Sequence, residues 1–288
     1  MKNPASARFL LPLILSAALT TPALAQHGAH SLPVVQVQGQ DHSFTSPASV
    51  PAGWTTLEFR NTGQEPHHLQ LVRLPDGMTQ ASFLAGLQAN EGATLASVEM
   101  VGGVGMLLPG QSQQVTVNLS EPGTYLELCF VPDEQGVPHL ALGMVKALEV
   151  KQAAQMAAQP PKADLQVKLV DYGFELPRGV TVTEGPQVWE IANDGPEGHE
   201  MTVFRLAPGK TMEDVNAYLK NPQGAMPLIP LGGAQAMAKG RVSYLHLDLA
   251  PGEYVMVCMV PSPGHQGAPH AALGMVRPFT VAAKSAQR

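Results

Sequence analysis

Four side chains that can bind a soft metal occur twice in this chain, in the same order. The two sets are His67, Cys129, His139 and Met144, followed by His199, Cys258, His270 and Met275. Nine residues separate the cysteine from the second histidine in the first set and eleven in the second, while four residues separate that histidine from the methionine in both. A thiolate and two imidazoles form a trigonal site that suits copper, and a thioether can be its weak axial ligand. The pattern predicts one copper ion per set.

Each residue type also has a structural interpretation. Isolated histidines are often surface residues, methionines often fill cores, and two cysteines in an exported protein often form a disulfide. A disulfide between Cys129 and Cys258 is disfavoured, because both occupy the same position in separate repeats and a bridge needs Cα atoms within about 7 Å. His68 adjoins His67, and only the alignment with His199 favours His67 as the ligand.

The two sets belong to an internal repeat. Residues 125–145 (YLELCFVPDEQGVPHLALGMV) match residues 254–276 (YVMVCMVPSPGHQGAPHAALGMV), with two extra residues in the second loop. Upstream, the Gly102-Gly103 and Gly232-Gly233 pairs also match. We predict two separately folding domains, residues 34–151 and 164–283, joined by a linker at 152–163 (QAAQMAAQPPKA) that has no core pattern.

Apolar and polar residues alternate over much of each repeat, which predicts short strands. The expected strands are 35–37, 54–59, 69–74, 115–119, 125–130 and 143–150, then 165–169, 187–191, 201–206, 242–249, 254–260 and 275–281. One helix is expected in each repeat, at 80–87 after Thr79 and at 212–219 after Thr211, where Asp214 completes a capping box. With 28 glycines and 26 prolines for turns, this predicts an all-β fold of two Greek-key β-sandwiches, each with one short inserted helix.

The order of one early histidine, then Cys-loop-His-x4-Met, resembles the cupredoxin superfamily of type 1 (blue) copper proteins. The resemblance covers both repeats, and the long Cys–His loops are most similar to those of copper nitrite reductases. It implies a His-Cys-His-Met copper site in each domain. Copper nitrite reductases and multicopper oxidases place histidines next to this cysteine, whereas the flanking residues here are Leu128, Phe130, Val257 and Met259. The resemblance therefore implies an electron carrier or binding protein and not an enzyme.

The two predicted sites differ beside the cysteine. Glu127 shares strand parity with Cys129 and is expected to point inward, where an unpaired carboxylate would cost several kcal/mol or would compete as a ligand. Met256 occupies the matching position in the second repeat. If only one site holds copper, we expect it to be the second. Other histidines, including His42, His246 and His265, have no histidine at the matching position of the other repeat and are expected to be structural.

The N-terminus has the pattern of a secretory signal peptide at residues 1–25. Lys2 and Arg8 precede the apolar run 9–19, and Ala23-Leu24-Ala25 is typical of a cleavage site before Gln26. The run is too short for a membrane span, although an uncleaved anchor is the alternative. Loss of Lys2 and Arg8 changes the net charge from −6 to −8, and no basic cluster follows, which argues against a nucleic-acid partner. We expect a periplasmic or secreted protein.

Three functions remain open at this point. The first is electron transfer through copper to a redox partner protein. The second is copper sequestration, or delivery to a copper chaperone, which needs the same ligands. The third is a non-metal interaction module on a cupredoxin frame, which predicts that no copper is retained.

Overall fold

The computed structural model describes residue 1 and residues 32–153, 158–221 and 223–284. The predicted signal peptide lies outside these residues except for Met1, and so do residues 154–157 of the predicted linker. The described residues from 32 to 284 form one compact unit. The described linker residues, 152–153 and 158–163, belong to no helix or strand.

The two repeats contain matching series of strands, each interrupted by one α-helix. The first has β1 (Val34–Gln40), β2 (Ser43–Thr45), β3 (Ser49–Pro51), β4 (Trp54–Asn61), β5 (His67–Arg73), α1 (Gln80–Ala96), β6 (Glu99–Leu107), β7 (Ser112–Asn118), β8 (Gly123–Leu128) and β9 (Val145–Lys151). The second has β10 (Leu165–Val170), β11 (Gly173–Glu175), β12 (Val182–Thr183), β13 (Gly185–Asn193), β14 (His199–Leu206), α2 (Met212–Lys220), β15 (Leu228–Met237), β16 (Val242–Leu249), β17 (Gly252–Val257), the 3-10 helices η1 (Pro263–His265) and η2 (His270–Leu273), and β18 (Val276–Ala282). The all-β prediction is confirmed.

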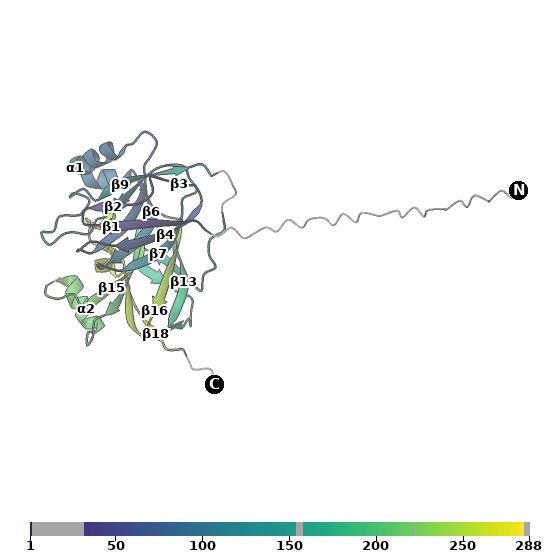
Figure 1. Ribbon diagram of the computed structural model, residues 1–288. Helices are drawn as coiled ribbons and strands as arrows, with labels where there is room; N and C mark the ends of the chain where they lie inside the picture. The colour runs from purple at the N-terminus through teal and green to yellow at the C-terminus, as the bar shows by residue number, and fades with distance from the viewer. Residues whose placement is uncertain (2–31, 154–157, 222, 285–288) are drawn as a thin grey trace. The chain divides into compact units, whose positions relative to one another are not determined.

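Two sheets run through both repeats. One has the strand order β11-β10-β13-β16-β7-β4-β1-β2, and the other has the order β12-β18-β17-β14-β15-β6-β5-β8-β9-β3. The repeats meet where β7 pairs with β16 and where β6 pairs with β15, in both cases antiparallel. Figure 1 shows β7 and β16 side by side at this junction. Each repeat therefore contributes strands to both sheets, and the two sheets are the layers of the β-sandwich.

One apolar core lies between the sheets and continues from one repeat into the other. A single cluster of buried side chains contains Phe59 and Leu69 of the first repeat with Trp189 and Val203 of the second. Strand β1 shows how the core is lined, because every second residue is buried along it. Separate folding of the two domains stays a prediction. The shared core argues against it, because a repeat on its own would lose the contacts that the other repeat supplies.

Strands β6 and β15 were not expected from the sequence, because their glycines interrupt the alternating pattern. A Cβ atom at Gly103, whose φ is 142°, would lie 1.9 Å from the carbonyl oxygen of Leu69. A Cβ atom at Gly105 would lie 2.6 Å from the carbonyl carbon of Gly232 on the facing strand. Glycine is needed here because the two backbones approach too closely for a side chain.

The pairing at the junction shows an approximate two-fold relation between the repeats. Val104 and Ala234 occupy matching positions of the repeat, and they pair with each other across β6 and β15. In the other sheet, Val115 pairs with Leu245 and Thr116 pairs with Tyr244. Equivalent positions thus exchange roles across the junction, as in the isologous interface of a two-fold dimer.

The two helices begin where the sequence predicts. Thr79 and Thr211 cap their helices, and Asp214 completes the expected capping box. Helix α1 extends beyond its expected end to Ala96, across a kink where Asn90 has φ −160° and ψ 93°. The glycine-rich sequence around this kink hid the second part of the helix.

Candidate metal centres

The candidate ligands come from equivalent places in the two repeats. The early histidine begins β5 or β14, and the cysteine directly follows β8 or β17. The second histidine lies between β8 and β9 in the first half, and it begins η2 in the second half. The methionine immediately precedes β9 or β18, whereas residues 143–144 and 275 were expected to be part of a strand. The side chains of all eight candidate ligands are fully buried.

At the first centre three donor atoms converge. The Nδ1 atoms of His67 and His139 are 3.0 Å apart. The Sγ atom of Cys129 is 3.6 Å from Nδ1 of His139 and 4.0 Å from Nδ1 of His67. These residues form one of three groups among the described residues that could hold a metal ion.

The second centre repeats this arrangement. The Nδ1 atoms of His199 and His270 are 2.9 Å apart, and Sγ of Cys258 is 3.4 Å from Nδ1 of His270. The backbone N–H of Glu200 points to the same sulfur atom at 3.5 Å. Cys129 and Cys258 are both free thiols, as expected from their positions in the repeat.

A carboxylate lies behind each histidine, on the Nε2 side. Nε2 of His67 is 3.0 Å from Asp41, and Nε2 of His139 is 2.8 Å from Glu65. Glycine makes room for the first of these pairs, because a Cβ atom at Gly63 would lie 2.2 Å from an oxygen of Asp41. Such carboxylate partners orient metal-binding imidazoles.

The second centre has the same pairs. His199 contacts Asp171, and His270 is 3.0 Å from Glu197. The sequence analysis missed all four carboxylates, although the repeat places a glutamate two residues before each early histidine and an aspartate at each matching β-turn. Glu65 and Glu197 could have been found from that match.

The donor set fits a soft cation. At the second centre both Nε2 atoms face carboxylate acceptors, so the Nε2–H tautomer is favoured and two Nδ1 lone pairs face each other at 2.9 Å. Burial lowers the pKa of His199, which disfavours the imidazolium form. Two buried acceptors in contact need a shared cation between them, and the adjacent thiol supplies a soft third donor.

Burial also acts on the two thiols. It raises the pKa of Cys129 to about 12 and holds the pKa of Cys258 well above its usual range. A thiol in such a place keeps its proton unless a metal displaces it, because metal binding requires the thiolate. These cysteines therefore lack the features of a nucleophile and suit a ligand.

The methionines are tied to the other ligands through the backbone. The N–H of Cys129 donates to the carbonyl of Met144 at 3.3 Å, and the N–H of Met144 donates to the carbonyl of His139 at 2.9 Å. The same two bonds join Cys258, Met275 and His270 at 3.2 and 2.9 Å. The cysteine, the histidine loop and the methionine thus form one hydrogen-bonded unit in each repeat.

His68 lies outside the first centre, although the sequence left it as a possible ligand. Its Nε2 accepts a hydrogen bond from the N–H of Phe130 at 2.7 Å. Glu200, at the matching position, accepts from the N–H of Met259 at 2.9 Å. Both side chains fix the backbone directly after the cysteine by accepting a hydrogen bond from it, which is a structural role.

Glu127 is fully buried, as its strand parity predicted, but it has partners. Ser46 donates to its carboxylate at 2.9 Å, and Nζ of Lys146 is 3.7 Å away. Burial raises the pKa of Glu127. In the second repeat Met256 and Leu176 replace the glutamate and the serine. Met256 belongs to the apolar core, and Leu176 is partly buried and packs against it.

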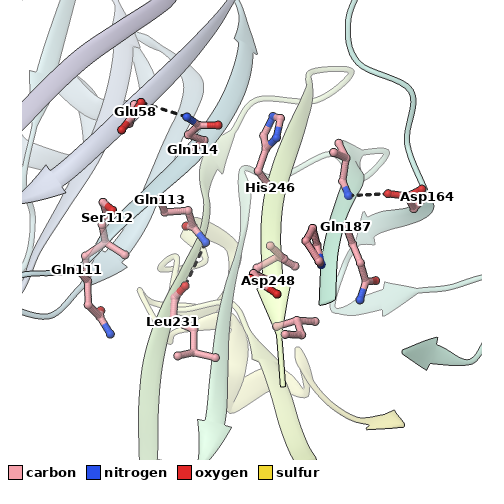
Figure 2. Close-up of a pocket in the computed structure, with 15 residues that line it drawn as sticks. Glu58, Gln111, Ser112, Gln113, Gln114, Asp164, Gln187, Leu231, His246 and Asp248 are labelled. Atoms are coloured by element: carbon pink, nitrogen blue, oxygen red, sulfur yellow. Dashed lines mark hydrogen bonds between the residues drawn. The ribbon is translucent and has the colours of Figure 1, made fainter. Parts of the chain in front are cut away.

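His246 and His265 belong to neither of the two His–Cys–His groups. A cleft of 780 Å³ is lined by residues of both repeats. Gln113 lies in this cleft and donates to the carbonyl of Leu231 at 3.1 Å (Figure 2). His246 lies there, 3.1 Å from the hydroxyl of Thr116. Outside the second centre, Nδ1 of His265 is 3.0 Å from the hydroxyl of Tyr172.

Both halves resemble the cupredoxin fold. The resemblance rests on two layers of strands in each half and on an early histidine that meets the Cys–His–Met segment in space.

No protein-family model matches the sequence, and no curated protein matches it. Among solved structures, auracyanin A, a "blue" copper protein from Chloroflexus aurantiacus, is similar at 21% identity over 42% of this chain and 100% of its own, with a TM-score of 0.30. A multicopper oxidase is similar at 16% identity over 87% of this chain and 89% of its own, with a TM-score of 0.26. A Cu-containing nitrite reductase from Thermus scotoductus is similar at 11% identity over 87% of this chain and 61% of its own, with a TM-score of 0.24.

None of the described helices has the length and apolar character needed to cross a membrane.

Proposed function

We propose that each half binds one copper ion at its His–Cys–His centre and that the protein transfers electrons. The observation that carries the proposal is the convergence of two buried Nδ1 atoms and a buried thiol, found twice. Copper bound at these donors supplies a one-electron redox couple. The redox partner is proposed to be another protein.

The residues of each centre have separate roles in this proposal. His67, Cys129 and His139, with their counterparts His199, Cys258 and His270, hold the metal. Met144 and Met275 are the proposed weak axial ligands. Asp41, Asp171 and Glu197 orient the imidazole rings that they contact, and full burial of the donors excludes water.

The second centre is the stronger candidate if only one half retains copper. Both of its carboxylate–histidine contacts have hydrogen-bond geometry. At the first centre the contact between His139 and Glu65 is short, but the ring N–H does not point at the carboxylate. Carboxylates that already hold the ligating imidazoles in place increase metal affinity, which favours the second half.

Electron transfer is proposed in preference to catalysis, because no histidine flanks Cys129 or Cys258 in the sequence. Export is proposed from the signal-peptide pattern. Mass spectrometry of the mature protein is expected to show a chain that starts at Gln26, whereas a mature chain that starts at Met1 would reject cleavage.

Copper loading tests the proposal. Copper(II) is expected to give an intense thiolate charge-transfer colour. Cys258→Ser should abolish the contribution of the second centre and Cys129→Ser that of the first, because the thiolate is the source of the colour. Colour that survives both substitutions together would reject the type 1 assignment. Ready transfer of the metal to a chaperone without reversible reduction would support sequestration or delivery, and no retained copper would support the interaction module.

A further inference from the structure

The two-residue turn between β1 and β2 contributes to the outer side of the first centre. Asp41 of this turn contacts His67, and the next residue, His42, faces Glu65 and His139. His42 has a φ of 61°, an uncommon conformation for a residue with a side chain. The turn holds its imidazole within 5.2 Å of the His139 ring, measured between centroids.

Three polar atoms meet at this point without hydrogen bonds. They are Nε2 of His42, Oε2 of Glu65 and Nε2 of His139, and each is inaccessible to solvent. Oε2 of Glu65 is 2.8 Å from Nε2 of His139 and 3.7 Å from Nε2 of His42. Buried polar atoms normally have partners, so three unpaired ones in contact indicate a missing shared partner.

The equivalent place in the second half has no such deficit. Tyr172 replaces His42, and its hydroxyl donates to Glu197 at 2.9 Å. Ser262 donates to the same carboxylate at 3.1 Å, and His270 contacts its other oxygen at 3.0 Å. The carboxylate there is satisfied by the protein alone, which makes the unpaired atoms specific to the first half.

We propose that His42, Glu65 and His139 form a second metal site in the first half, for a divalent cation such as zinc. Two histidines and one glutamate, with a water molecule in the fourth position, are a ligand set that zinc uses in proteins. Two ligands about 2.0 Å from a tetrahedral zinc ion lie about 3.3 Å apart, and the separations of 2.8 and 3.7 Å lie on either side of this value.

His139 belongs to both sites through different nitrogen atoms. Its Nδ1 faces Cys129, while its Nε2 faces Glu65. A metal at the outer site would bind Nε2 of His139 in place of its proton, which would be released, while Nδ1 would stay available to the inner site. The outer site does not depend on copper at the inner one, since His42 and Glu65 supply two of its three ligands.

Zinc binding tests the inference. The mature protein is first saturated with copper, freed of excess metal and then titrated with Zn²⁺ by equilibrium dialysis with elemental analysis. The wild type should bind one zinc ion more than His42→Asn, or bind that ion at least tenfold more tightly. Asparagine is chosen because it tolerates a positive φ. His265→Asn, at an exposed histidine of the second half, should leave zinc uptake unchanged.

Equal zinc uptake and affinity in the wild type and His42→Asn would overturn the proposal. Anomalous diffraction at the zinc edge from wild-type crystals gives a check that needs no variant. A peak between His42, Glu65 and His139 is expected, and zinc located only elsewhere would overturn the proposal. Zinc uptake that depends on His42 in a protein without copper colour would retain the outer site while rejecting the copper centres. Copper colour with zinc uptake independent of His42 would do the reverse.

Discussion

At the first centre the carboxylate beside the second histidine faces His42 and lacks hydrogen bonds, whereas at the second centre it accepts one from Tyr172. The inner donors differ little, since the two Nδ1–Nδ1 distances are 3.0 and 2.9 Å. Divergence is therefore concentrated in the residues that surround the metal donors. Two centres with the same donors can differ in affinity and potential through such surroundings.

The strand beside the cysteine shows the same contrast. Glu127 is hydrogen-bonded to Ser46, while at the matching positions Met256 belongs to the apolar core and Leu176 packs against it. A polar pair has thus been exchanged for an apolar pair at corresponding positions. A buried polar pair is stable only when both members are present, so the exchange must involve both residues.

The largest expected effect comes from splitting this pair. Ser46→Leu alone removes the hydroxyl that donates to Glu127 and should lower the free energy of unfolding by about 3 kcal/mol. Ser46→Leu with Glu127→Met reproduces the second half and should restore most of that loss. Urea unfolding of the two single variants and the double variant measures the coupling. Additive losses would show that the two side chains do not act as a pair.

The next effect concerns the aspartates of the two β-turns. Asp41→Asn and Asp171→Asn each remove the negative charge behind an early histidine, and each should weaken copper binding at its own centre by about 10- to 100-fold. Competition with a chelator measures the affinity. The other centre is inactivated by its Cys→Ser substitution so that one centre is observed at a time. Unchanged affinity in either variant would mean that the aspartate does not support the histidine.

A smaller effect is expected from the methionines. Met144→Leu and Met275→Leu should keep the colour of the centre and shift its reduction potential, because an axial thioether tunes the metal more than it holds it. A tenfold change in the relative stability of two oxidation states corresponds to about 59 mV for one electron, and we expect shifts of this order. Spectroelectrochemistry measures them. Loss of colour would instead make the thioether a required ligand.

The smallest effect lies at the junction between the repeats. Burial lowers the pKa of His246, whose matching residue is Val117. Above pH about 6.5 the residue is neutral in both the folded and unfolded states. As the pH falls below this value the unfolded state takes up a proton first, so stability should decrease until the folded pKa is reached. His246→Val should flatten this part of the pH profile, measured by thermal unfolding, and an unchanged profile would assign the slope to other groups.

The sequence predicted the candidate ligands, many strands and the helix starts, because each of these patterns occurs in both repeats. A histidine or methionine alone says little, but the same order of four candidate ligands in both halves selected His67 over His68. The structure brings the two histidines and the cysteine of each set together. Strands with regular alternation, such as β1 and β16, were expected from their pattern. The capping threonines Thr79 and Thr211 also marked the helix starts correctly.

Other features depend on contacts between residues far apart in the chain. The junction between the repeats depends on the register of β6 and β15 and on the close approach of their backbones. The sequence does not reveal this pairing, because the glycines of these strands carry no side-chain pattern. Asp41 reaches His67 only when the turn after β1 is brought beside the start of β5.

The sequence by itself determined the internal repeat, the all-β class and the set of candidate metal ligands, because these follow from residue type and spacing. Only the tertiary structure decided that Glu127 has Ser46 as its partner and that His42 faces Glu65. The physical reason is that burial and hydrogen bonding depend on distance in space. A carboxylate that looks unfavourable in the sequence becomes acceptable when the fold supplies a donor.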